Sequence, residues 1–467
     1  MNKYIFLIIL MAFPSVVWGS FGVNETEMIS YPGGKCYIFR LKLADKKNTP
    51  YRLDKPLDFL SQRSIDRRKK QHLAIDSTDL PISPAYLSAI SANQKIHIVG
   101  KSKWNNSVLI KCSHPNNAYK LLKLPFVKNV VQVFSSPDSI SNSTRSSFKK
   151  EFNRWDTIPD SRYGVAVNQI TSLGGDRLHA VGYRGKGKII AVLDAGFMNV
   201  DKIPALHQIK IAGIDDFVVP KSKNIFAESD HGTMVLSLMA TDLPGTYIGT
   251  APDASYMLLR CEDTHTESLS EEDYWAEAVE YADSVGADIV NSSLGYHDFD
   301  DPSTNHKYYE MDGMTTFISR TASMLANKGM ILVNSVGNDG MGTWKKLNFP
   351  ADARNIITVG AITPHGDNAA FSAVGPTADG RIKPDVMAYG SPAVVISGRG
   401  TIVDDMGTSF SAPLISGMVA CLWQALPDKT AKEIIDIVIH SGNNAHPDNV
   451  YGYGVPDFQK AYNSGKR

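Results

Sequence analysis

From about residue 163 to the end, the sequence alternates short apolar strands with helices. Strands that are apolar along their whole length are typical of a parallel sheet that is covered on both faces. The pattern predicts an α/β domain over residues 163–467, with a mostly parallel sheet and helices on both faces. The expected strands are 188–193, 255–260, 287–291, 330–335 and 356–359, and the clearest helix is 271–284.

A smaller α+β domain is predicted over residues 20–134. The order of its elements is strand, helices, two strands, helix, strand. The expected strands are 35–43, 96–100, 108–112 and 127–134, and the expected helices are 58–71, 84–91 and 117–124. The composition then shifts to Ser, Asn, Asp, Lys and Pro over residues 135–162, which predicts an exposed and cleavable linker.

The first expected helix of this smaller domain carries the basic run Arg67-Arg68-Lys69-Lys70. Such a run is either a processing site or a solvated helix face. A solvated face is the more common role of a charge run on a helix, so we favour it here.

Residues 1–19 have the pattern of a secretory signal: Lys3 is followed by an apolar stretch, 4–17, and a plausible cleavage site at Val17-Trp18-Gly19. The apolar stretch contains Pro14 and is short for a membrane span. We therefore expect an exported protein, secreted or in the periplasm or cell envelope, with no membrane span.

The 48 basic and 48 acidic residues cancel, so no overall field favours nucleic acid or an anionic membrane as a partner. Four cysteines are too few for a disulfide scaffold. Cys36 and Cys112 lie in strand-like segments and could pair with each other. Cys261 and Cys421 lie in apolar runs, where a cysteine is usually a small buried side chain.

Four segments carry residue types that suit nucleophilic catalysis. Three of them are an apolar strand that ends at Asp194, the run Asp230-His231-Gly232, and Ser335-Val336-Gly337-Asn338. The fourth is Gly407-Thr408-Ser409-Phe410-Ser411-Ala412-Pro413, where a loop becomes a helix. A serine at a helix start meets free backbone N–H groups and the positive end of the helix dipole. Each segment alone has an ordinary structural explanation; all four in this order do not.

Together these segments resemble the subtilase family of serine endopeptidases, in the chain order Asp, His, Ser. The resemblance extends from about residue 163 to 462 and implies a subtilisin-like fold. It implies that Ser409 attacks a peptide carbonyl, that His231 is the base, and that Asp194 orients His231. The oxyanion hole would consist of the Asn338 side chain and the backbone N–H of Ser409.

The resemblance also extends to the substrate cleft. Ser293, Leu294 and Gly295 resemble the Ser-Leu-Gly strand of the family, beside which an extended peptide adds by backbone hydrogen bonds. Residues 335–337 would form one wall of the pocket for the side chain before the cut, with Gly337 leaving room for that side chain. The expected substrates are therefore proteins or peptides.

The N-terminal domain resembles the propeptides of the family in its position and element order, although it is longer. This implies an inactive precursor whose own propeptide covers the active site as an intramolecular inhibitor and is cut away near residues 135–165. A permanent accessory domain is the alternative. Monomer is the default state of the family.

The sequence departs from the family pattern at Ala195, where a small hydroxyl residue is usual, at Met234, where a second His is common, and at Ser335, where Ala is frequent. Hydrogen bonds around the catalytic residues should therefore differ. The Asp-rich segment 296–313 is longer than in the simplest members; a solvated loop is favoured there over a cation site or a specificity element. The resemblance requires no cofactor for the chemistry, identifies no metal ligand and leaves structural calcium open.

Two other functions compete with that of a protease. One is a catalytically silent subtilase whose groove only binds a peptide; the presence of Asp194, His231, Ser409 and Asn338 argues against it. The other is an acyl hydrolase acting on esters; the Ser-Leu-Gly strand favours peptides instead.

Overall fold

The computed structural model describes residues 28–31, 34–141, 153–154, 157–220, 222 and 224–466. The predicted signal at 1–19 and residues 142–152 of the predicted linker lie outside these ranges. Within the described ranges, no helix combines the length and the apolar character that crossing a membrane requires.

The N-terminal domain contains a four-stranded antiparallel sheet in the order β3-β4-β2-β5. Its strands are β2 (Tyr37–Leu43), β3 (Ile96–Ser102), β4 (Ser107–Cys112) and β5 (Val127–Ser135). The helices are α1 (Gln62–Lys70), α2 (Pro84–Ser91) and α3 (Pro115–Tyr119), with short 3-10 turns at Pro56–Asp58 and Lys120–Lys123. A separate pair, β1 (Met28–Ser30) and β6 (Ser139–Ser141), is antiparallel. The elements agree with the predicted small α+β domain.

The second domain has a seven-stranded parallel sheet in the order β15-β14-β13-β12-β7-β11-β8, which confirms the predicted α/β class. Its strands are β7 (Ile189–Asp194), β8 (Lys210–Asp216), β11 (Ser255–Arg260), β12 (Ile289–Ser292), β13 (Ile331–Ser335), β14 (Ile357–Ile362) and β15 (Val386–Tyr389). Two small antiparallel pairs lie outside it: β9 (Asp242–Leu243) with β10 (Tyr247–Ile248), and β16 (Ala393–Ile396) with β17 (Ile402–Asp405).

Successive residues of the buried strands belong to different cores, because strand side chains alternate between the faces of a sheet. On β7, Ile190 and Val192 pack in the core that contains α6 (His231–Ala240) and α9 (Thr408–Ala425). Ala191 and Leu193 pack in the core that contains α7 (Ser270–Val285) and α8 (Phe317–Ala322). Helices therefore cover both faces, as predicted. The remaining helices are α4 (Val167–Thr171), α5 (Gly175–Ala180), α10 (Ala431–Ile439) and α11 (Phe458–Gly465). Short 3-10 turns lie at Pro204–Leu206, Ile225–Ala227, Pro302–Thr304, Tyr308–Glu310 and Leu325–Lys328.

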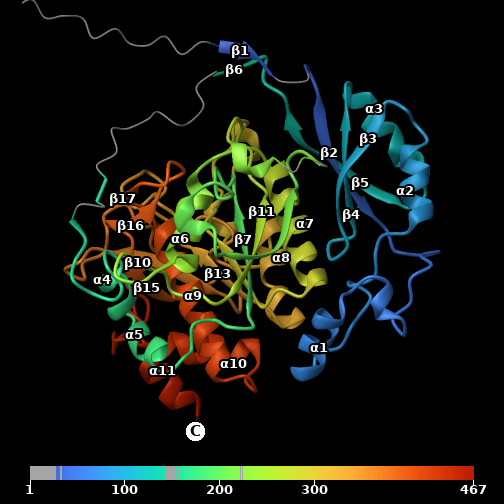
Figure 1. The fold of residues 1–467 in the computed structure, drawn as a ribbon. Coiled ribbons are helices and arrows are strands. Elements are labelled where there is room, and N and C mark those ends of the chain that lie inside the picture. Colours follow the sequence, from blue (N-terminus) through green and yellow to red (C-terminus); the bar gives the residue numbers. More distant parts are fainter. Residues whose placement is uncertain are drawn as a thin grey trace, which may run out of the picture.

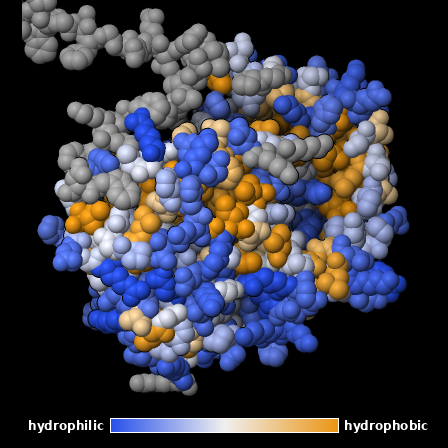
Figure 2. Space-filling view, in the orientation of Figure 1, coloured by the Kyte–Doolittle hydropathy of each residue, from blue (hydrophilic) through white to orange (hydrophobic). Residues whose placement is uncertain are grey.

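The N-terminal sheet lies against α7, so that this helix of the second domain packs between the N-terminal sheet and the parallel sheet (Figure 1). Ile38, Leu109 and Val133 of the N-terminal sheet join the core that α7 shares with the parallel sheet. The other face of the N-terminal sheet, with Phe39 and Leu41, packs in that domain's own core. Hydrophilic residues cover most of the face seen in Figure 2, with apolar patches between them over both domains.

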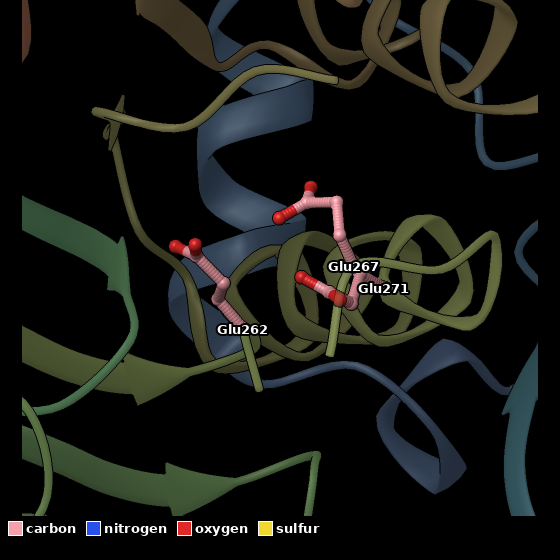
Figure 3. Close-up of side chains that lie close together, drawn as sticks. All are labelled: Glu262, Glu267 and Glu271. Atoms are coloured by element: carbon pink, nitrogen blue, oxygen red, sulfur yellow. The ribbon is translucent and has the colours of Figure 1, made fainter. Parts of the chain in front are cut away.

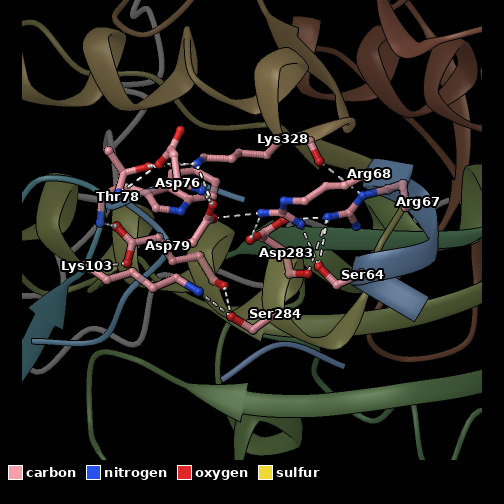
Figure 4. A network of polar contacts seen from close by, with 12 residues as sticks. Ser64, Arg67, Arg68, Asp76, Thr78, Asp79, Lys103, Asp283, Ser284 and Lys328 are labelled. Atoms are coloured by element: carbon pink, nitrogen blue, oxygen red, sulfur yellow. Dashed lines mark hydrogen bonds and ion pairs between the residues drawn. The ribbon is translucent and has the colours of Figure 1, made fainter. Parts of the chain in front are cut away.

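Only half of the basic run on α1 is the solvated face that we favoured, because Lys69 and Lys70 are exposed whereas the two arginines are buried. Arg67 and Arg68 are only 7% and 1% exposed, because both guanidinium groups reach the carboxylate of Asp283 on α7. Arg68 also pairs with Asp79, at 2.9 Å. Asp79 in turn pairs with Lys328, which continues the network (Figure 4). The prediction failed for the two arginines because Asp283, the carboxylate that they share, is 216 and 215 residues away in the sequence. Burial also makes the two arginines an inaccessible processing site in this precursor.

All four cysteines are free and buried. Cys112 faces the core of the N-terminal domain, whereas Cys36 faces the core shared with α7. The two side chains thus leave opposite faces of one sheet, which rules out the Cys36–Cys112 bond that the sequence left open. Cys261 and Cys421 are buried among apolar side chains, as predicted.

Candidate active site

Three neighbouring strands deliver the predicted site residues at one edge of the parallel sheet. The three strands are neighbours in the order β13-β12-β7. Asn338 follows β13, residues 293–295 follow β12, and Asp194 is the last residue of β7. All three are parallel, so their carboxyl ends meet at the same edge. Two helices begin at this edge: α6 at His231 and α9 at Thr408, one residue before Ser409.

The His231 ring is held by Asp194, whose side chain is fully buried. His231 Nδ1 lies 2.8 Å from Asp194 Oδ1 and 3.0 Å from Oδ2. The backbone N–H of Ala195 donates a second hydrogen bond to Oδ1, at 2.8 Å. Nδ1 therefore carries the proton when the ring is neutral, and Nε2 is left as the basic nitrogen.

Charge on the His231 ring is favoured by its surroundings. Burial works against the charge, but Asp194 outweighs it, with smaller contributions from Glu262 and Asp405, and the pKa of His231 rises from 6.5 to about 9. The ring is nevertheless accessible, since 29% of the side chain is exposed. A base at this position is thus strong and reachable from solvent.

Ser409 lies in the first turn of α9 and is 9% exposed. Its hydroxyl donates to the carbonyl of Ser293, at 3.2 Å, while the Ser293 hydroxyl donates to the carbonyl of Ser409, at 2.8 Å. Ser409 and His231 line the same cleft. In this conformation the Ser409 hydroxyl is directed to the predicted substrate strand.

The amide of Asn338 is oriented by Thr408, a residue that the sequence analysis did not single out. Its Oδ1 accepts from both the backbone N–H and the hydroxyl of Thr408, each at 2.9 Å. Because only the oxygen can accept these bonds, the NH₂ group must lie on the other side of the amide. Asn338 also lines the cleft that contains Ser409, so it can supply donors there.

A second residue that the sequence analysis missed, Asn348, fills the space between the two glycines of the predicted substrate pocket. A Cβ on Gly295 would lie 2.8 Å from Asn348 Cβ, and a Cβ on Gly337 would lie 2.8 Å from Asn348 Cγ. Gly337 also has φ +110°, which a side chain would strain. The room that Gly337 leaves is therefore taken by Asn348, which makes the pocket shallow.

The environment of Asn348 is polar. Its Nδ2 donates to Asp339 Oδ2, at 2.9 Å, and its Oδ1 is buried without a hydrogen-bond partner among the described residues. Asp339 Oδ2 lies 3.3 Å from His297 Nε2. The hydrogen bond between these side chains is the main reason why the pKa of Asp339 is lowered. No local sequence signal marks Asn348, since it lies ten residues beyond the Ser335–Asn338 segment.

Apart from Asp194, which is buried behind His231, the predicted residues line one cleft of about 400 Å³. It is lined by residues of the second domain: His231, Ser409, Asn338, Ser293, Leu294, Gly295, Gly337, Ala195, Ser229, Asp230, Glu262, Thr264, Ser335, Asp339, Asn348 and Thr408. Leu294 is buried and packs in the core on the α7 side, so it contributes backbone rather than side chain to the cleft.

Comparison with known proteins agrees with this geometry. The model of the subtilase family matches residues 185–454, more than half of the chain. The chain belongs to the subtilase family. A second family model, the Peptidase S8 propeptide domain of Bacteroidota, matches residues 39–150. The N-terminal domain is accordingly a propeptide domain of the subtilase type.

Individual subtilases are similar at low identity. Subtilisin DY of Bacillus licheniformis is 26% identical over 313 residues, which cover 65% of this chain and 98% of that protein. The subtilisin-like protease SBT6.1 of Arabidopsis thaliana is 29% identical over 289 residues, or 60% of this chain. The membrane-bound transcription factor site-1 protease of Mus musculus is 27% identical over 302 residues, or 62% of this chain. The matches span only 25% and 26% of the latter two proteins.

The departures of this subtilase from the family pattern are accommodated by backbone groups and packing. Ala195 has no hydroxyl, but its backbone N–H donates a hydrogen bond to Asp194 Oδ1. Met234 packs against the α6 and α9 core. Ser335 is 4% exposed at the end of β13. The hydrogen bond to Asp194 is thus supplied by the main chain.

The Asp-rich segment 296–313 is a loop with two short 3-10 turns. Its carboxylates mainly hold local turns: Asp301 accepts from the N–H of Ser303, and Asp312 from the N–H groups of Met314 and Thr315. This use supports the expected solvated loop. Asp300 is different, because its carboxylate accepts the backbone N–H of Glu267 across the loop, at 3.0 Å.

Proposed function

We propose that the protein is an exported serine endopeptidase that is made as an inactive precursor. The observation that carries the proposal is the joint geometry of one cleft: an Asp194–His231 pair, Ser409 at the start of α9, and an Asn338 amide oriented by two hydrogen bonds. This combination of a base, a nucleophile and an oriented amide in one cleft supports acyl transfer as the reaction.

In the proposed reaction, Ser409 Oγ attacks the carbonyl carbon of the scissile bond as His231 Nε2 takes the hydroxyl proton. Asp194 stabilises the imidazolium that forms and holds its orientation. The negative charge on the carbonyl oxygen is met by Asn338 Nδ2 and the backbone N–H of Ser409. His231 then protonates the leaving amine, and water releases the acyl group from Ser409 in the same way.

The substrate is proposed to bind as an extended peptide beside residues 293–295. Because Asn348 fills the space beside Gly337, the side chain before the cut should be small. The unpaired Oδ1 of Asn348 would favour a side chain that can donate a hydrogen bond, such as Ser or Thr.

The proposed domain organisation is a signal at 1–19, a propeptide domain at 20–134, a linker with the processing bond at 135–162 and the catalytic domain at 163–467. Two observations support an intramolecular inhibitor. Residues 39–150 match the propeptide family model, and buried ion pairs join α1 to α7. Export through the signal would place the mature enzyme outside the cytoplasm, and we expect a monomer.

The proposal is tested with the full chain and its Ser409→Ala variant. We expect the parent chain to lose about its first 140 to 160 residues, to react with a serine-directed fluorophosphonate probe and to cleave chromogenic peptides with a small residue before the cut. Ser409→Ala should stay uncut and unlabelled. Intact mass and N-terminal sequencing measure the loss of residues, and gel fluorescence measures labelling by the probe.

The same experiment separates the rival functions. If neither protein is cut or labelled, the catalytic proposal fails and the cleft is a peptide-binding groove. If the parent hydrolyses esters but no amide, the peptidase proposal fails in favour of an esterase.

A further inference from the structure

Three glutamates gather beside the cleft, and none of them takes part in a bond-making step of the proposed reaction. Glu262 and Glu267 lie on the loop between β11 and α7, and Glu271 lies in the first turn of α7. One carboxylate oxygen from each lies within 4.8 Å of the other two. Figure 3 shows the three side chains close together at the start of this helix.

Glu271 is the member that a capping role does not explain. An acidic residue in the first turn is favourable, and Glu271 Oε1 accepts the backbone N–H of Ser268 at 3.1 Å. Its Oε2, however, is buried and has no hydrogen-bond partner among the described residues, in a side chain that is fully buried. Capping thus accounts for one oxygen and leaves the other unmatched.

A second buried oxygen nearby is also unmatched. Tyr296 directly follows the proposed substrate strand, is 2% exposed, and its hydroxyl has no hydrogen-bond partner among the described residues. Burial raises the pKa of Tyr296, and the charges of Glu271 and Glu262 raise it further. The hydroxyl therefore lies within the field of the same glutamates.

Glu271 is fully buried, and its neighbours Glu262 and Glu267 are also acidic. A fully buried carboxylate beside two others costs several kcal/mol unless it takes up a proton or binds a cation. Glu262 and Glu267 are half-buried, so an ion has a route to the cluster from solvent.

The spacing suits calcium. Calcium binds oxygen at about 2.3–2.6 Å and accepts six to eight ligands, so two of its ligands lie at most about 5 Å apart. The three oxygens fall inside that span, and three carboxylates can provide up to six oxygens. We propose that Glu262, Glu267 and Glu271 form a binding site for a hard divalent cation, with calcium as the best fit.

The site would fix one wall of the cleft. Glu262 lines the cleft beside His231, and the backbone of Glu267 is tied to the Asp-rich loop through Asp300. A cation would therefore clamp the loop between β11 and α7 to the first turn of α7. This proposal does not depend on the proposed peptidase activity, because its test reads binding and stability.

The test uses the full-length Ser409→Ala protein, so that self-cleavage cannot disturb it, after treatment with EDTA. In this background we compare the parent with Glu271→Gln, which keeps the shape of the side chain and an oxygen for the Ser268 N–H. Asp201→Asn, which removes an exposed carboxylate from a turn, is the matched control. Melting is followed with and without calcium or magnesium, and terbium luminescence reports direct binding.

We expect calcium to raise the melting temperature of the parent and of Asp201→Asn by several degrees, with magnesium less effective. Terbium should emit on excitation of tyrosine, and calcium should displace it. Glu271→Gln should lose the terbium signal and most of the calcium shift while melting no lower than the parent in EDTA.

Three results would overturn the proposal. One is a calcium shift of equal size in the parent and in Glu271→Gln. Another is no calcium effect together with a higher melting temperature of Glu271→Gln, which means that Glu271 holds a proton. The third is Glu271-dependent binding of a basic peptide but not of calcium, which means that the cluster is a substrate pocket.

Discussion

Helices α7 and α9 cover opposite faces of the same sheet, yet they differ in what they bury. Residues 408–425, which form α9, contain no charged side chain, and those from Thr408 to Trp423 are buried. Helix α7 buries several acidic side chains, among them Asp273, Glu280 and Asp283. These meet Arg40, the β3–β4 turn and α1 of the propeptide domain.

The difference distinguishes a permanent core from an interface between parts that separate. Exposing the apolar side chains around α9 to water would be unfavourable, so the packing around α9 is permanent. Acidic side chains on the outer side of α7 become well hydrated once the propeptide leaves. A polar interface is typical of partners that exist apart as well as together. We therefore expect variants near α9 to change catalysis and variants on α7 to change docking of the propeptide.

The largest effect is expected at Asn338, whose side chain accepts hydrogen bonds from Thr408 at the start of α9. Asn338→Ala should lower kcat by about 10²–10³-fold, because one donor to the developing oxyanion is lost. KM and propeptide docking should hardly change, since among the described residues the Asn338 side chain hydrogen-bonds only to Thr408, and it lines the cleft. Steady-state kinetics of the processed enzyme measure this; a loss confined to KM would contradict the assigned role.

The pH dependence of catalysis follows from His231. The pKa of His231 is raised to about 9, so the protonated ring, which cannot act as a base, predominates at pH 7. The neutral fraction increases about tenfold per pH unit below that value. We expect kcat/KM to rise about fiftyfold from pH 7 to pH 9, where half of the rings are neutral. A profile that falls over this interval would show that His231 is not the base.

On α7, Asp283→Ala should loosen the propeptide without changing the chemistry. It leaves Arg67 and Arg68 buried without their shared carboxylate, which in a closed interior costs about 3–5 kcal/mol. We expect docking to weaken about 10²-fold, the lower end of that range, because water can reach a domain boundary. The rate at which peptidase activity appears after dilution of the processed complex measures it.

Asp428→Asn is the matched control for Asp283→Ala. Asp428 pairs with Lys70 across the same boundary, at 3.5 Å, but its side chain is 95% exposed. An exposed pair contributes little to stability, so release of the propeptide should change less than about fivefold. Equal effects of the two variants would refute the distinction between buried and exposed charges at this interface.

A separate effect concerns docking and pH. Burial against the propeptide raises the pKa of Glu280 to about 7 and that of Glu277 to about 8. After release both return towards their ordinary value near 4.5, so docking takes up protons and weakens as pH rises through 7 to 8. We expect propeptide release to become at least about tenfold easier from pH 6 to pH 8, and up to a few hundredfold easier if both pKa values return fully to 4.5. Tighter docking at pH 8 would contradict this.

Local sequence patterns predicted most strands of the two larger sheets, because each pattern depends on nearby residues. The helix at 84–91 and the strand at 255–260 match α2 and β11 to the residue. Strand β8 was missed because Lys210–Asp216 is polar at both ends and contains Gly213. Strand β15 was missed because it has only four residues and follows Pro384.

The candidate site was predictable where family motifs mark it, and not elsewhere. Asp194, His231, Asn338 and Ser409 each lie in a recognisable segment. Asn348 enters the pocket from a loop with no such motif. Arg67 and Asp283 are 216 residues apart in the chain, and the three glutamates belong together only when β11 and α7 are in place. Long-range contacts of this kind require the fold.

The charges around α7 have a consequence for the surroundings in which the precursor matures. Arginines line the propeptide side of the boundary and carboxylates line the catalytic side, so the separated parts attract each other over a distance that dissolved ions shorten. Dilute media would therefore keep a freshly cut propeptide in place, whereas brackish or saline media would let it diffuse away. The ionic content outside the cell would then act as a timer for the appearance of activity.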